Sequence, residues 1–195
     1  GILIKENHIA AAGGHGAGSG GGSLRGIVGA ALVAILWGSG PVLAQSTTPA
    51  PMHSVLLALA GRWEGSGVLL NRPGTFSMEW RIADGGFAHL WFANRWIDPD
   101  GAITPMLSAH ATYWVQGDSA VGVWLDDRPE QLTLRASLTD SSVVTQWTAT
   151  GEQGHTEYLI RSPSLALVRD FVLVDGVPRP FAEATYQRAA NSPGG

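Results

Sequence analysis

The chain has 195 residues, of which 45% are apolar, so it can bury the core of one domain and carry extra segments at its ends. It contains no Cys, which excludes disulfides, thiolate metal sites and a cysteine nucleophile. A net charge of -4 argues against a nucleic-acid partner, which requires a basic face, and against docking on anionic lipid.

Residues 24–44 have the three-part form of a signal peptide. A positive residue, Arg25, precedes an apolar run from Gly26 to Trp37, and small residues follow before Gln45. The run is about a dozen residues long, too short to span a bilayer as a helix. No Cys marks a lipoprotein cleavage site. We therefore expect cleavage and a periplasmic or secreted product, with an uncleaved anchor or a buried helix as the alternative.

The residues before this segment differ from the rest of the chain, and Lys5 is its only lysine. Ile2–Ile9 (Ile-Leu-Ile-Lys-Glu-Asn-His-Ile) resembles an active-site strand of quinolinate phosphoribosyltransferases. The resemblance implies that Lys5 contacts anionic substrate groups, although that family usually has Asp where this chain has Glu6. Nothing downstream shows the repeated strand–helix units of that enzyme's barrel. We interpret residues 1–23, which end in the Gly/Ser-rich stretch His15–Ser23, as a disordered, fusion-like fragment without activity.

A short helix and a series of strands are expected after the Pro/Thr-containing linker of residues 45–52. His53–Ala60 is an apolar helix candidate that Gly61 ends. Thr75–Ile82 alternates strictly between apolar and polar side chains, which is the period of a half-buried strand. Short turns separate the later strands. The predicted strands are residues 63–70, 75–82, 87–97, 107–115, 120–126, 131–138, 142–148, 155–161, 165–174 and 181–188.

The regular spacing of about ten short strands predicts an all-β domain over residues 53–190. Strands joined by short turns form an antiparallel meander, which either closes into a barrel or folds into a sandwich. We expect the closed barrel, because closure removes exposed sheet edges. The first and last strands are then neighbours, and residues 191–195 form a disordered tail.

The most informative motif is Gly61-Arg62-Trp63-Glu64-Gly65-Ser66-Gly67, which opens the first strand. Its last two glycines allow the strand to bend and another backbone to approach. The motif resembles the Gly-x-Trp opening of calycin-like barrels, including lipocalins and nitrobindin-like proteins. Asp84-Gly85-Gly86-Phe87 and Tyr186-Gln187-Arg188 further resemble small exported bacterial barrels of unknown function in that group.

This resemblance spans residues 56 to 188 and implies a calycin-like barrel closed by a late arginine on the motif's indole. We therefore expect Arg188 to stack on Trp63 through a cation–π contact. Arg62 is the competitor, but an adjacent strand residue points to the opposite face. The residues with an expected structural role are Gly61, Trp63, Gly65, Gly67 and Arg188.

Several side chains on aromatic strand faces are candidates for binding a ligand. His89 shares a face with Trp91, and His110 shares one with Trp114. A lone His in such a setting is more often a packed, hydrogen-bonded residue. Arg169 and Asp170 interrupt an apolar strand, so one of them faces its apolar side, as a ligand-orienting group or as part of an ion pair. The ligand-binding candidates are Trp80, His89, Trp91, His110, Trp114 and Arg169.

No sequence pattern identifies a catalytic or metal site. The His residues of the domain show neither His-x-His nor His-x-x-x-His spacing, and no nucleophile elbow, phosphate loop or dinucleotide fingerprint occurs. The nitrobindin-like resemblance implies haem held by a late His, for which only His155, next to a turn and expected to be exposed, is available. We expect no metal and no cofactor.

The leading functional hypothesis is an exported binding module for a small apolar ligand, with no nucleic-acid partner and no membrane contact after signal cleavage. Small barrels either fill with side chains or keep one cavity, and apolar cavities suit such ligands. One alternative is an isomerase- or cyclase-type enzyme that uses His110 or His89 with a nearby acid. Others are a haem-binding barrel and a filled barrel that acts through its surface.

Overall fold

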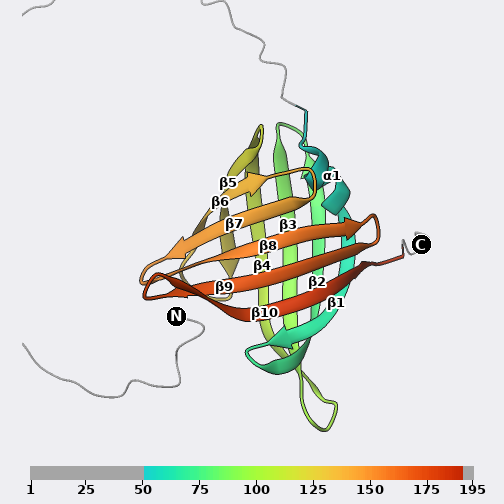
Figure 1. Cartoon of the computed structure of the whole chain (residues 1–195), viewed down its shortest axis with the longest axis vertical. Coiled ribbons are helices and arrows are strands. Elements are labelled where there is room, and N and C mark those ends of the chain that lie inside the picture. The colour runs from blue at the N-terminus through green and yellow to red at the C-terminus, as the bar shows by residue number, and fades with distance from the viewer. Residues whose placement is uncertain (1–50, 191–195) are drawn as a thin grey trace, which may run out of the picture. The chain divides into compact units, whose positions relative to one another are not determined.

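In residues 51–190, the part of the chain that the structure describes, the alternating segments pair into one antiparallel meander (Figure 1). The coordinates are a computed structural model. The elements are α1 (Ser54–Leu59), β1 (Gly61–Leu69), β2 (Arg72–Ala83), β3 (Phe87–Ile97), β4 (Ile103–Gln116), β5 (Ser119–Asp126), β6 (Leu132–Leu138), β7 (Ser142–Ala149), β8 (Glu152–Ser162), β9 (Leu165–Val174) and β10 (Val177–Arg188).

Each strand pairs with its neighbours in sequence, and β1 also pairs with β10, which closes the barrel. The expected all-β fold, with ten strands and a short N-terminal helix, is confirmed. No helix within residues 51–190 is long and apolar enough to cross a membrane. The predicted fragment, signal peptide and C-terminal tail, and all but the end of the linker, lie outside the described residues.

Four strands begin three or four residues earlier than the sequence pattern predicted. β2 begins at Arg72 instead of Thr75, β4 at Ile103 instead of Leu107, β8 at Glu152 instead of His155, and β10 at Val177 instead of Phe181. In each case the extra residues continue the ladder of a hairpin, as in the pairing of Ile103 with Ile97. Three of these extensions contain prolines, which are unusual within strands and hide the strand pattern.

The barrel interior is filled mainly by large side chains from alternate strand positions. The largest of the fully buried side chains include Trp63, Trp80, Tyr186 and Phe76. Helix α1 buries Val55, Leu56 and Leu59, and Figure 1 shows it at one end of the barrel, away from the β1–β2 and β3–β4 connections. One end is therefore covered by a helix.

The predicted contact between Arg188 and Trp63 is confirmed. The two residues are paired across β1 and β10, and the guanidinium carbon lies 4.2 Å from the indole centroid. Arg188 also donates to the carbonyls of Ala58, Ala60 and Pro163, while Trp63 Nε1 donates to the Leu59 carbonyl at 2.7 Å. One arginine thus joins the helix, the first strand and the β8–β9 turn.

Two of the opening glycines, Gly61 and Gly67, occupy positions where a Cβ is not accommodated. Gly61 has a φ of +113°, which residues with a Cβ rarely adopt, where the chain leaves the helix for β1. A Cβ on Gly67 would collide with the Glu183 carbonyl of β10, so the close approach of the two backbones requires glycine there. The strand that closes the barrel therefore depends on these residues.

Candidate functional site

The predicted ligand-binding residues do not gather at one place. Trp80 points into the barrel and is 1% exposed. His89, Trp91, His110 and Trp114 lie on the outer face of β3 and β4. Arg169 is on the outer face of β9, where it forms ion pairs with glutamates of β8 and β10. A ligand inside the barrel can therefore contact only the first of these six, and the binding roles of the other five stay predictions.

Two histidines and a tryptophan form a stack on the outer face. The ring centroids of Trp91 and His110 are 4.7 Å apart, and those of His89 and His110 are 5.6 Å apart. Partial burial and the neighbouring His89 lower the pKa of His110. Within residues 51–190 neither histidine forms an ion pair with a carboxylate. The His–acid pair that the isomerase or cyclase alternative requires is not formed here.

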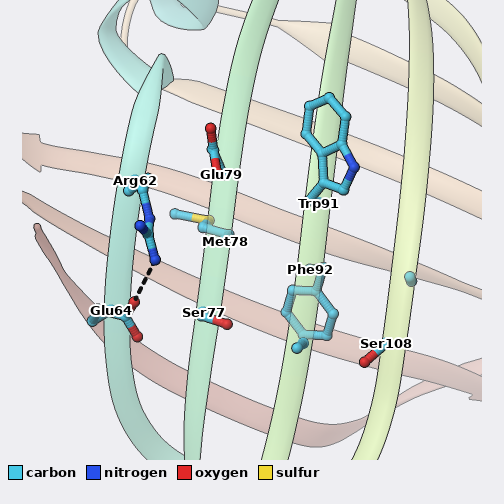
Figure 2. Close-up of a pocket in the computed structure, with 10 residues that line it drawn as sticks. Arg62, Glu64, Ser77, Met78, Glu79, Trp91, Phe92 and Ser108 are labelled. Atoms are coloured by element: carbon cyan, nitrogen blue, oxygen red, sulfur yellow. Dashed lines mark ion pairs between the residues drawn. The ribbon is translucent and has the colours of Figure 1, made fainter. Parts of the chain in front are cut away.

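A groove of about 290 Å³ runs beside this stack on the outer face of β1 to β4. Figure 2 shows its charged side chains: Arg62 faces Glu64, with 3.9 Å between their charged atoms, and Glu79 lies between them and Trp91. The groove is open to solvent along one side. A second open groove, of about 420 Å³, lies on the outer face of β7 to β9. Because both grooves are open, neither would surround a ligand on all sides.

Polar side chains from four strands meet inside the barrel, and we call this group the lumen cluster. The register places Thr145, Thr156 and Asp170 directly opposite one another on β7, β8 and β9. Thr156 donates its hydroxyl proton to Asp170 Oδ1 at 2.6 Å, and the Tyr113 and Thr145 hydroxyls are 3.3 Å apart. The members of the lumen cluster are Tyr113, Thr145, Thr156, Tyr158 and Asp170.

Asp170 is the electrostatic centre of the lumen cluster. Burial raises its pKa to about 6, with a smaller opposing effect from the Thr156 hydrogen bond. Burial also raises the pKa of Tyr113 to about 12 and that of Tyr158 well above its usual value, and Asp170 contributes to both shifts. Asp170 lies deep in the barrel, although the residue as a whole keeps part of its surface accessible.

Unpaired polar atoms also mark the interior. Trp80 packs flat against Tyr113 at 5.6 Å and edge-on against Tyr158 at 5.3 Å, and its Nε1 is buried without a hydrogen-bond partner. On β3 the inward-facing Asn94 has an equally unpaired Oδ1. Buried polar atoms normally have a partner. One donor and one acceptor inside this barrel therefore have no partner among the described residues.

No family model matches the chain. No curated protein matches it either. Among solved structures, it is similar to the S-type phycobiliprotein lyase CPES from Guillardia theta, at 10% identity and a TM-score of 0.49, over 70% of this chain and 92% of the lyase. A redesigned β-barrel, b11L5F_LGL, matches at 12% identity and a TM-score of 0.42, over 72% of this chain and 100% of the design. The redesigned barrel mFAP1, solved bound to DFHBI, matches at 12% identity and a TM-score of 0.42, over 69% of this chain and 99% of the design. At these values the likeness extends no further than a β-barrel fold.

A haem or metal site has no visible basis in the described part of the chain. Residues 51–190 contain no group of three or more His, Cys, Asp or Glu side chains that could hold a metal ion. His155, to which the nitrobindin-like resemblance points, lies on the outer face and stacks on Phe171 with 4.5 Å between centroids. It is half-buried by this contact, so the expectation that it is exposed was wrong.

The sequence pattern missed most of the lumen cluster. Asp170 was noticed, because it interrupts an apolar strand, but the candidate was its neighbour Arg169. Tyr113 and Tyr158 occupy inward positions of regular alternation, so they looked like ordinary core residues. Thr145 and Thr156 carried no signal, since only the register between strands brings them to Asp170.

Proposed function

We propose that this protein is a small-ligand-binding barrel whose site is the interior space at the lumen cluster. The observation that carries the proposal is a set of enclosed polar groups. The Asp170 carboxyl has a hydrogen bond from Thr156 but no cationic partner, and the buried atoms Trp80 Nε1 and Asn94 Oδ1 have no hydrogen-bond partner. A mainly apolar interior with a few converging polar groups is typical of small-molecule sites. The unpaired atoms are those that a ligand would satisfy.

The arrangement of the barrel ends supports access from one side. Helix α1 covers one end (Figure 1). Elsewhere in the barrel the inward-facing Phe92 and Trp124 contact each other at 5.7 Å but stay only half-buried. Beside them, Arg128 bridges Asp126 and Glu152 at 2.7 and 3.4 Å. We infer that a ligand enters between these aromatic side chains, at the end away from the helix.

We further propose that the barrel is of the calycin-like type and that the protein is exported. The Gly-x-Trp opening with its stacked Arg188 supports the first proposal. The signal-peptide pattern of residues 24–44 is the only support for the second, and it favours the periplasm or the exterior.

The proposal is tested by blocking the interior next to Asp170. Ala182 faces Asp170 across β9 and β10 and is buried, whereas Thr185 on the same strand is exposed. We expect the full chain to bind the neutral apolar dye Nile red with an increase in fluorescence. Ala182→Leu should weaken this binding at least about tenfold by occupying the site, and Thr185→Leu should leave it unchanged.

Circular dichroism melting of both variants shows whether the barrel remains folded. A wild-type chain that does not bind the dye, or a folded Ala182→Leu variant that binds it as tightly as the wild type, contradicts an internal site.

A further inference from the structure

We propose that the lumen cluster recognises an organic cation, a protonated amine on an apolar body, with Asp170 as its counter-ion. This inference rests on the proposed function and specifies the class of ligand. Three features carry it: a carboxyl without a cationic partner, aromatic rings beside that carboxyl, and the contrast with a second enclosed carboxyl in the same barrel.

The first feature is the missing partner of Asp170. Arg169 is the nearest arginine in the chain, but it points outward and pairs with Glu157 and Glu183. Among residues 51–190 Asp170 takes part in no ion pair, and its hydrogen bond comes from the neutral Thr156. Buried charges in proteins are normally paired, because an isolated one is costly. Among the described residues Asp170 therefore lacks the positive partner that a buried carboxylate normally has, and a bound cation would supply it.

Asp126 is a second carboxyl enclosed in this barrel, and it has the structural partners that Asp170 lacks. Its side chain is fully buried, and the Arg128 guanidinium and Trp124 Nε1 both donate to it, at 2.7 and 2.8 Å. Burial acts to raise its pKa, but these hydrogen bonds bring the pKa below its usual value. Asp170 lacks such donors. The two acids differ in whether the protein itself provides the positive charge.

The second feature is the aromatic surround. Tyr113 and Tyr158 lie near enough to Asp170 for its charge to raise their pKa values, and both pack on Trp80. The faces of such rings attract cations, most strongly where water is excluded. A carboxylate of the ligand would be repelled by Asp170, and a neutral ligand would leave its charge unpaired. A cation carrying apolar groups satisfies both the acid and the rings.

The charge of Asp170 makes the recognition dependent on pH. Its hydrogen bond comes from Thr156 of β8. The side chains whose pKa its charge raises are Tyr158 of β8, Tyr113 of β4 and Tyr186 of β10, and none of these groups is cationic. Asp170 is neutral below its pKa of about 6 and ionised above it. Amine affinity should therefore rise between pH 5 and pH 7, roughly tenfold per pH unit below that pKa, and level off above it.

Three probes share a phenyl group but differ in charge, so they separate the effect of charge on affinity from that of shape. They are 2-phenylethylamine, 2-phenylethanol and phenylacetate. We expect calorimetry on the full chain at pH 7.5 to show the amine binding about tenfold or more tighter than the alcohol, and the acid weakest. Asp170→Asn keeps the size of the side chain and an acceptor for Thr156. It should weaken amine binding at least about thirtyfold while alcohol binding changes less than about threefold. Asp140→Asn, in the exposed β6–β7 turn, is the matched control and should change neither.

The outcomes distinguish the inference from the proposal on which it rests. If Nile red and the alcohol bind but the amine has no advantage, or if folded Asp170→Asn retains the amine affinity, the cation site is wrong and the binding barrel stands. If neither the dye nor any of the three probes binds the wild type, both proposals are wrong. The pH profile of the wild type tests the same role without a substitution, and a flat profile between pH 5 and pH 8 contradicts it.

Discussion

Arg188 is the residue on which barrel closure depends most. Its guanidinium stacks on Trp63 and donates to carbonyls of the helix and of the β8–β9 turn. Removing it loses the cation–π contact and leaves several carbonyls without donors, which together should lower the free energy of unfolding by about 2–4 kcal/mol. Urea denaturation of Arg188→Ala measures this loss.

Arg62 provides the matched control for this prediction. It neighbours Trp63 in sequence but points outward, is 69% exposed and faces Glu64 at 3.9 Å. Arg62→Ala should change stability by less than about 0.5 kcal/mol, because exposed ion pairs contribute little. Equal effects of the two substitutions would show that the contact with Trp63 does not stabilise closure.

Asp170 should also make the stability of the empty barrel depend on pH. Its pKa is about 6 in the folded protein, above the ordinary value of 3.8, so folding favours the protonated form. This contribution is fully present below about pH 4 and is lost as the pH rises through 6. At pH 8 the ionised carboxylate destabilises the fold, and Asp170→Asn should raise the free energy of unfolding there by about 1–3 kcal/mol.

The measurement is a urea titration of both proteins at pH 4 and at pH 8. The difference between the variant and the wild type should be larger at pH 8 than at pH 4. A difference of the same size at both values would mean that Asp170 is not a buried acid with a raised pKa.

At the scale of single elements, alternation predicted which side chains share a face but not always which face is inside. In β3 both faces carry aromatic residues: Trp91 faces outward, while Phe92 and Leu90 face inward. The grouping of His110 with Trp114 on β4 was also correct, yet this face is the outer one. A strand that is apolar on both faces leaves the choice to its partners, which local sequence does not specify.

The candidate site was harder to predict, because it exists only between elements. Thr145, Thr156 and Asp170 are separated in sequence and meet because three consecutive strands align in one register. A shift of one residue in any of them would turn that side chain outward. Alternation predicted that one of the two neighbours Arg169 and Asp170 faces the interior, and only the assembled sheet shows that it is Asp170.

At the scale of the whole molecule, the strand spacing was enough to predict the closed meander. Ten strands joined by short turns can satisfy every edge only if the last strand returns to the first, and β10 pairs with β1 over seven residue pairs. The spacing of the strands along the sequence does not predict how much space remains inside the barrel. That depends on how the buried aromatic side chains pack together, as Trp80 does with Tyr113 and Tyr158.

The closed ladder also predicts how the chain responds to shortening. Within the described residues, β1 is bonded on both sides, and α1 docks on the barrel through its own apolar residues. Every strand of the barrel has both of its hydrogen-bonded neighbours among β1 to β10. A protein that begins at Gln45 should therefore melt within about 2 °C of the 195-residue chain, because the loss of segments outside a cooperative unit does not change its unfolding. Calorimetry of the two proteins measures this, and a large drop in Tm would show that the domain begins before Gln45.

Amino-terminal sequencing of exported protein checks the same boundary: we expect it to begin at Gln45, and a product that still contains Lys5 would refute cleavage.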